Sequence, residues 1–282
     1  MTQAADQPME DHVLVEVTVP APADAVWAAL RDPAKIKDWF GWETDGLKDE
    51  IDFIFVTHAA ADEATRTVTF VGVNDRYEVE ARGETSLVRV VRSAPAGDWS
   101  DVFDGMIEGW ISFTWQLAFA LARHPGQSRR TLFFSGPPRE DRLARSLLGL
   151  DAAPAAGEPW TGPLGPDQSA GQVWFTARHQ IGVTVDAWGD GLLIVVDQPP
   201  TEKKPRGFTM LTLTTYDQSD ADYYSQAGDL FRLMSTDQKR QLVNNIAGGL
   251  SQANASIQER MLAYLNKADP EYAAMVKAAL AA

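Results

Sequence analysis

Hydrophobic residues in the segment 103–123 recur at intervals of three and four positions. Ile107, Trp110 and Leu117 belong to this series, which is the periodicity of a helix with a broad apolar face. A histidine, a proline and a glycine follow at 124–126 and end the series, because proline and glycine interrupt helices. The segment therefore predicts one long helix that needs an apolar layer beside it.

The residues before this helix predict an antiparallel sheet. Short runs rich in Val, Thr, Phe and Tyr are separated by turn residues such as those at 74–75 and 82–83. Short connections favour antiparallel hairpins over a parallel sheet. After the first strand, the pattern predicts a short helix over 24–31 and a helical turn over 34–39. The predicted strands cover residues 12–19, 51–57, 65–73, 77–81 and 86–93.

A second β-rich block follows the long helix, and a helical tail closes the chain. From Gly228 onward strand formers disappear, and Ser235 begins a helix-capping pattern that Gln238 completes. The block itself contains a predicted helix over 139–150 and a long irregular loop over 151–170. Its predicted strands cover residues 130–135, 172–176, 191–197 and 208–216.

These changes of pattern predict an α+β chain in four parts. The parts are a flexible N-terminal tail at 1–9, a sheet-and-helix domain at 10–126, a β-rich extension at 127–217 and a helical segment at 218–282. The order of elements in the extension is similar to that of the preceding domain. A diverged second copy of the same half fold is therefore an alternative interpretation of the extension.

Composition excludes several classes of function. The chain has 282 residues, no cysteine and a net charge of −14. The negative charge disfavours nucleic acids and anionic membrane surfaces as partners, and the lack of cysteine excludes disulfides, thiolate nucleophiles and thiolate-held metals. The sequence contains no run of about 18 apolar residues, so it predicts no transmembrane helix. The first residues do not resemble a secretory signal. We expect a cytoplasmic protein.

A search for reactive motifs finds no metal, phosphate or dinucleotide site. No two of the 4 histidines lie within one helical turn of each other, so no metal-binding spacing occurs. A phosphate loop, a dinucleotide fingerprint and a nucleophile elbow are also missing from the sequence. We therefore predict no metal, no cofactor and no catalytic residue, and favour a binding protein over an enzyme.

Aromatic residues are more informative than titratable ones. The chain has 9 tryptophans, and aromatic side chains gather near residue 40 and on the predicted long helix. Such side chains either fill a core or line a pocket for an apolar ligand between sheet and helix, and one helix face can do both. The predicted ligand-binding residues are Trp39, Phe40, Phe53, Phe55, Trp110 and Phe113.

Three stretches resemble the SRPBCC superfamily, also called START-like or helix-grip. They are Ala25-Val-Trp-Ala-Ala-Leu-Arg-Asp-Pro-Ala34, Trp39-Phe40 and Glu108-Gly-Trp110. Within the superfamily, the likeness is to homologues of the activator of the heat-shock chaperone ATPase. It covers about residues 10–125, while 129–137 and 171–216 look like the extension of longer members. The resemblance implies a curved antiparallel sheet around a long closing helix.

The same resemblance implies two kinds of function. Members of the superfamily bind hydrophobic small molecules, cyclise or hydrolyse polyketide-like substrates, or regulate chaperones. An apolar small molecule or a chaperone is thus the expected partner. A cyclase or hydrolase that uses the same cavity is the alternative, and its acid/base candidates are Asp52, Glu78, Glu80 and His179.

The tail resembles the C-terminal helical segment of haem catalases. Haem catalases carry out their chemistry in a separate barrel with a distal His, a distal Asn and a proximal Tyr, and no counterpart of the tyrosine-bearing helix occurs here. We expect the tail to cover apolar surface or to join copies of the chain. A catalase-related haem or peroxide protein is a further alternative. The matching pieces, in the same order, are 225–228, 231–235, 240–247, 257–260 and 267–272.

Overall fold

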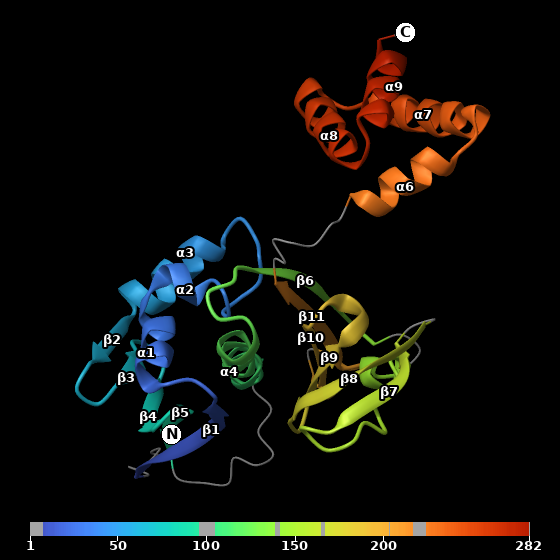
Figure 1. The fold of residues 1–282 in the computed structure, drawn as a ribbon. Helices are drawn as coiled ribbons and strands as arrows, with labels where there is room; N and C mark the ends of the chain where they lie inside the picture. Colours follow the sequence, from blue (N-terminus) through green and yellow to red (C-terminus); the bar gives the residue numbers. More distant parts are fainter. Residues whose placement is uncertain are drawn as a thin grey trace. The chain divides into compact units, whose positions relative to one another are not determined.

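The computed structural model describes residues 8–95, 105–138, 142–164, 167–202, 204–216 and 224–281. They fall into two compact units, Met1–Asp217 and Gln218–Ala282 (Figure 1). The first unit contains two antiparallel sheets and a long helix, and the second contains helices. The predicted α+β class, with a sheet around a long helix, a second β-rich block and a helical tail, is confirmed.

The first sheet has the strand order β1-β5-β4-β3-β2. All its neighbouring strands are antiparallel, as the short connections predict. Alternate residues of β1 turn inward, so that Val15, Val17 and Val19 are buried while their neighbours are more exposed. The elements up to this point are β1 (Met9–Val19), α1 (Ala23–Arg31), α2 (Pro33–Ile36), α3 (Leu47–Ile51), η1 (Asp52–Thr57), β2 (Ala59–Asp62), β3 (Thr67–Phe70), β4 (Asp75–Arg82) and β5 (Thr85–Pro95).

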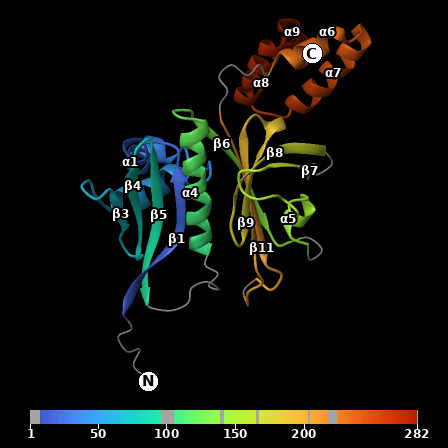
Figure 2. The same cartoon turned by 60° about the horizontal axis from the view of Figure 1, so that its bottom comes forward.

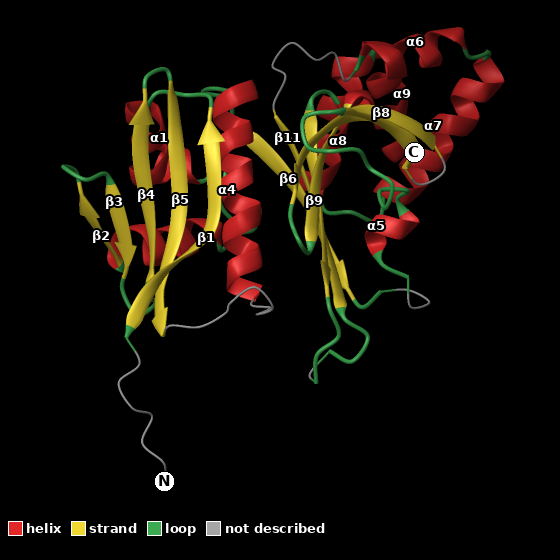
Figure 3. Cartoon of the chain, turned by 90° about the horizontal axis from the view of Figure 1, so that it is seen from below, coloured by secondary structure: helices red, strands yellow, loops and turns green. Residues whose placement is uncertain are grey.

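The long helix α4 (Gly105–Arg123) lies between the two sheets (Figures 2 and 3). The first two residues of the predicted helix, 103 and 104, lie outside the described residues. Leu117 is fully buried in the same apolar cluster as Val17 and Val88 of the first sheet. Trp115 stacks on Phe175 of the second sheet, with ring centroids 4.9 Å apart. One helix therefore provides apolar surface to both sheets.

The second sheet has the order β6-β11-β10-β9-β8-β7. Its central strands β9 and β10 are buried along their whole length, because α4 covers one face and a second apolar cluster covers the other. The described part of this block contains no helix as long as α4. Its elements are β6 (Arg129–Gly136), α5 (Ala144–Leu147), β7 (Pro159–Leu164), β8 (Asp167–Thr176), β9 (Gln180–Val185), η2 (Asp186–Trp188), β10 (Gly191–Gln198) and β11 (Phe208–Tyr216).

The strand predicted over 51–57 is wrong. The chain continues α3 into η1, a stretch of wider π-helix, over these residues. Ile51, Phe53 and Phe55 would share one face of a strand, but Phe53 is 59% exposed while Ile51 and Phe55 are buried. The buried pair is spaced four residues apart, which is the period of a helix. Alternating apolar residues in so short a segment fit both patterns.

Two predictions in the second block also need correction. Most of the loop predicted over 151–170 is occupied by β7 and the start of β8, which form a hairpin, and β9 was not among the predicted strands. The helix predicted over 139–150 is described only as the short α5, and residues 139–141 lie outside the described residues. Gly and Pro are abundant here and are ordinarily depleted in strands, which hid the hairpin.

The C-terminal unit consists of α6 (Ser225–Leu233), α7 (Thr236–Leu250), α8 (Ala255–Ala268) and α9 (Pro270–Leu280). Phe231, Val243, Tyr272 and Val276 form its core. The predicted capping pattern at the start of α7 is confirmed, since the Ser235 side chain and the Gln238 side chain each accept a backbone N–H bond. None of the helices described in either unit is long and apolar enough to cross a membrane.

Candidate functional site

A cavity of about 460 Å³ lies beside the N-terminal half of α4. Its volume is within the range of about 300 to 1,000 Å³ that small-molecule sites occupy. Side chains of α4, η1, β3 and the segments 40–42 and 71–73 form the wall. The lining residues are Phe40, Trp42, Phe53, Ile54, His58, Phe70, Val71, Gly72, Val73, Gly105, Met106, Gly109, Trp110 and Phe113.

Two glycines of α4 help to create this space. Gly105, Gly109 and Phe113 are spaced four residues apart and therefore lie on one face of the helix. A Cβ atom at Gly109 would meet only Phe113, with its Cε2 atom at 3.8 Å, and one at Gly105 would meet no atom within 4 Å. Larger side chains at these two positions would fill the gap between helix and sheet. The two glycines leave this gap open.

Four of the six predicted ligand-binding residues lie on the cavity wall. They are Phe40, Phe53, Trp110 and Phe113. Their rings are in contact with other aromatic rings of the wall: Phe40 and Phe113 have centroids 4.8 Å apart, and Trp110 stacks on Phe70 at 5.0 Å. The structure therefore brings together residues that are 73 positions apart, and the ligand that such a wall would accept is apolar.

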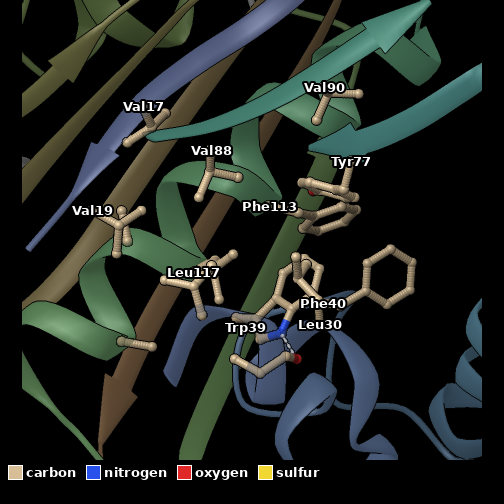
Figure 4. Close-up of a cluster of buried hydrophobic side chains, with 14 of the residues drawn as sticks. Val17, Val19, Leu30, Trp39, Phe40, Tyr77, Val88, Val90, Phe113 and Leu117 are labelled. Carbon is tan, nitrogen blue, oxygen red and sulfur yellow. Dashed lines mark hydrogen bonds between the residues drawn. The ribbon is translucent and has the colours of Figure 1, made fainter. Parts of the chain in front are cut away.

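Trp39 and Phe55 do not line the cavity. They are 1% and 2% exposed and pack within the core behind it. The Trp39 indole donates a 2.9 Å hydrogen bond to the Ala29 carbonyl, and its ring contacts Phe40 and Phe55 edge-on. Figure 4 shows Trp39 and Phe40 within the same buried cluster as Phe113. Trp39 and Phe55 thus support the wall instead of forming it.

Sequence reasoning missed several members of the wall. Trp42 belongs to the aromatic group near residue 40, and Phe70 lies in the strand predicted over 65–73, but nothing in their spacing distinguishes wall from core. His58 follows η1 and was hidden by the strand wrongly predicted there. The spacing of Gly105 and Gly109 on a helix was the signal that could have located the cavity, because small residues at that interval leave one helix face open.

A buried ion pair holds Trp110 in place. The Trp110 indole N–H donates to Asp75 Oδ2 at 2.8 Å. Arg92 holds the same carboxylate through Nε to Oδ1 at 2.6 Å and through Nη2 to Oδ2 at 2.8 Å. Because Asp75 is fully buried, its charge needs these partners. The indole N–H is thereby occupied, and the ring presents carbon to the cavity.

A buried tyrosine lies beside Trp110 without serving as an acid. Thr114 Oγ1 donates its hydrogen to the Trp110 carbonyl at 2.7 Å. The Tyr77 hydroxyl, 3.0 Å from Thr114 Oγ1, therefore donates to that Oγ1 atom. Burial raises the pKa of Tyr77 well above its ordinary value, with the Thr114 hydrogen bond opposing the shift. The hydroxyl therefore remains protonated and structural at neutral pH.

Arg129 of β6 holds the segment that carries Phe40 and Trp42. Its guanidinium donates to the carbonyl oxygens of Lys37 at 2.7 Å and Gly41 at 2.8 Å, and also to that of Phe40. Burial lowers the pKa of Arg129 to about 10, which leaves it charged at neutral pH. The second sheet thus fixes one wall of a cavity that otherwise belongs to the first sheet and α4.

The acid/base candidates for a cyclase or hydrolase lie elsewhere. Asp52 pairs with Lys48 at 2.6 Å, Glu78 with Arg76 at 2.7 Å and Glu80 with Arg89 at 3.0 Å. None of these three carboxylates lines the cavity, and His179 does not line it either. The described residues also contain no group of three His, Asp or Glu side chains placed to hold a metal ion.

Comparison with known proteins identifies the C-terminal segment. Residues 217–280 match the model of the catalase-related immune-responsive family. The catalase of an Onchocerca volvulus endobacterium is 48% identical over 63 residues, which are 22% of this chain and 13% of that protein. Catalase A of Pseudomonas putida is 45% identical over 76 residues, 27% of this chain and 16% of that protein. The C-terminal segment is catalase-related. The chain spans only these small fractions of the curated catalases.

Two solved structures are similar over the longer part of the chain. DynU16, a protein in the dynemicin biosynthetic locus, is 18% identical, with 96% of this chain and 97% of that chain covered and a TM-score of 0.26. The di-domain ARO/CYC protein BexL of the BE-7585A biosynthetic pathway is 13% identical, with 76% and 86% covered and a TM-score of 0.25. Because both TM-scores are low, the fold is assigned from the strand orders and the position of α4 and not from these two structures.

Proposed function

We propose that the N-terminal unit binds an apolar small molecule in the cavity beside α4, and that this molecule contains aromatic rings. The observation that supports this most strongly is the wall itself, in which the rings of Phe40, Phe70, Trp110 and Phe113 surround a space of about 460 Å³. Aromatic walls stabilise a bound ring system through stacking and edge-on contacts and through removal of apolar surface from water.

The described part of the wall offers few reactive groups, which favours binding without catalysis. Among the described residues, His58 is the one titratable side chain on the wall. The nearby buried carboxylates are already engaged: Asp75 with Arg92 and Glu108 with the Gln180 amide at 2.6 Å. A cyclase or hydrolase needs groups that transfer protons at the substrate, so the enzyme remains the weaker alternative.

A chaperone ATPase as partner stays a prediction of the START-like resemblance. Such a partner would contact the exposed surface of the unit, and its binding would not depend on the cavity. Capture of the chaperone by wild-type chain and equally by a Trp110 variant would support this function, whereas capture that requires Trp110 would support a role for the cavity.

For the C-terminal segment we propose a non-catalytic role, as a helical module that covers apolar surface or joins copies of the chain. Residues 218–282 contain no histidine and no cysteine, two common axial ligands of haem iron, and the tyrosine-bearing helix that holds haem in catalases has no counterpart in the sequence. Haemin added to the purified chain is therefore expected to give the spectrum of free haemin. A shifted Soret band would favour the haem or peroxide alternative instead.

Ligand binding can be tested by methyl NMR of the full chain. Naphthalene is a suitable first probe because it is apolar and aromatic. We expect saturable shifts of the Met106 and Ile54 methyl signals, both of which lie on the wall, while methyl signals of Val183 and Leu193 in the second cluster stay unchanged. Uniform small shifts without saturation would contradict the proposal.

A further inference from the structure

Among the described residues of the cavity wall, one side chain is able to form a hydrogen bond with a ligand. Trp42 and Trp110 also carry polar N–H groups, but the Trp42 indole donates to Thr212 Oγ1 at 3.0 Å and the Trp110 indole donates to Asp75. The remaining side chains of the wall, apart from His58, are hydrocarbon, thioether or glycine. His58 is therefore the polar feature of an otherwise apolar site.

The backbone fixes this histidine at the end of η1. Both its backbone N–H and its ring Nδ1 lie 3.0 Å from the Phe53 carbonyl oxygen. The His58 carbonyl in turn accepts a 2.7 Å bond from the Val71 N–H, which ties the residue to another part of the wall. The imidazole also packs on the Phe53 ring, with centroids 4.0 Å apart. Wide π-type turns of this kind are frequent at functional sites.

These contacts determine the hydrogen-bonding character of the ring. A carbonyl oxygen only accepts, so Nδ1 carries the hydrogen in the contact with Phe53. In the neutral imidazole the other nitrogen, Nε2, then has a lone pair and acts as an acceptor. Within the described part of the chain, the His58 ring forms its hydrogen bond through Nδ1 and forms none through Nε2.

We propose that Nε2 of His58 accepts a hydrogen bond from the ligand and makes the site selective for an apolar ring system that bears a hydroxyl group. This inference rests on the proposed ligand-binding function and adds the class of ligand. An apolar wall favours any ring of suitable size, whereas one acceptor distinguishes a ligand with an O–H donor from its ether or hydrocarbon counterpart.

Three probes of nearly equal shape test the inference with the full chain at neutral pH: naphthalene, 2-naphthol and 2-methoxynaphthalene. In the wild type, 2-naphthol should bind roughly three- to tenfold more tightly than 2-methoxynaphthalene, the range that one net hydrogen bond supplies. In His58→Phe the preference should disappear, so that the affinities of these two probes differ by less than about twofold, and naphthalene measures any general change in the cavity. His58→Gln offers a side-chain carbonyl as acceptor and should restore part of the preference.

His179→Phe is the matched control, because His179 does not line the cavity, and it should keep the wild-type preference. If naphthalene binds but the ratio of the two other probes is the same in wild type and His58→Phe, the inference is overturned and the ligand-binding proposal stands. If naphthalene does not bind the wild type, the ligand-binding proposal falls, and the inference with it. A preference for the ether that His58→Phe abolishes would overturn the acceptor role. Should His58→Phe not fold, the wild-type and His58→Gln ratios decide.

Discussion

Arg129 donates a hydrogen bond to the carbonyl oxygen of Gly41, 2.8 Å away, although the two residues are 88 positions apart in the chain. The contact joins the second sheet to the segment that contributes Phe40 and Trp42 to the cavity. Trp42 is held from the same side, through its bond to Thr212 of β11. The β-rich extension therefore takes part in building the site and does not merely follow it in the chain.

Replacement of Arg129 should loosen this wall. Arg129→Gln leaves the carbonyl oxygens of Lys37, Phe40 and Gly41 without their charged donor, so we expect a loss of about 2 to 4 kcal/mol in unfolding free energy and weaker naphthalene binding. Urea unfolding measures the first effect and NMR titration the second. Arg130→Gln is the control, because Arg130 is 74% exposed in its ion pair with Glu43 and such pairs contribute at most about 1 kcal/mol. Equal stability of the two variants would refute the role of Arg129.

The Trp110 indole should contribute to stability through its N–H group. Trp110→Phe keeps an aromatic ring on the wall but removes a donor to the buried Asp75 carboxylate, for an expected cost of about 1 to 3 kcal/mol. Trp27→Phe removes a comparable 2.6 Å bond to Glu63 at the surface and should cost less than about 1 kcal/mol. Chemical unfolding of both variants compares them, and a larger effect at Trp27 would contradict the account.

Acid should weaken the contact between Asp11 and Arg76. The hydrogen bond from Arg76, and then that from Ser93, lowers the pKa of Asp11 from its ordinary value of 3.8 to about 2. A lowered folded-state pKa gives stability that is fully present above about pH 4 and is lost as the pH falls through about 2. Unfolding free energies of wild type and Asp11→Asn should therefore converge from pH 6 to pH 2. A difference that does not change with pH would contradict this prediction.

Two glycines of the C-terminal unit should respond in opposite directions to alanine. A Cβ atom at Gly228 would lie 2.0 Å from the Ala268 carbonyl oxygen, so Gly228→Ala should destabilise the unit by about 1 to 3 kcal/mol. Gly248 has no atom near the corresponding position, and Gly248→Ala should stabilise α7 by up to about 1 kcal/mol. Hydrogen exchange of α6–α9 measures both changes. A stabilising or neutral effect of Gly228→Ala would show that the close approach of α6 to Ala268 is incorrect.

The sequence predicted long elements well and short ones poorly. The periodicity of 103–123 extends over several turns, and α4 is correct over its described residues, as are β1, α1 and the all-helical character of the tail. The segment 51–57 is short enough that Ile51, Phe53 and Phe55 fit a strand as well as a helix. Only its continuation from α3 and its contacts with the rest of the fold decide between them.

The sequence predicted an apolar cavity between sheet and helix, but it predicted only some of the residues that line it. Aromatic residues in the sequence indicate apolar packing, but wall and core use the same side chains. Trp39 and Phe40 are neighbours, yet one is core and the other is wall. Which of two such rings borders empty space depends on the opposing helix, and here on Gly105 and Gly109, whose effect appears once α4 is placed against the sheet.

Gly109 offers the most direct test of the cavity. Gly109→Ala adds a Cβ atom at ordinary contact distance from Phe113 and should retain naphthalene binding, with α4 stabilised by up to about 1 kcal/mol. Gly109→Leu places a larger side chain into the space itself. We expect naphthalene affinity to fall at least about tenfold in Gly109→Leu, which is about 1.4 kcal/mol, while its unfolding midpoint stays close to that of the wild type. Undiminished naphthalene affinity in a folded Gly109→Leu chain would contradict the assignment of this cavity as the binding site.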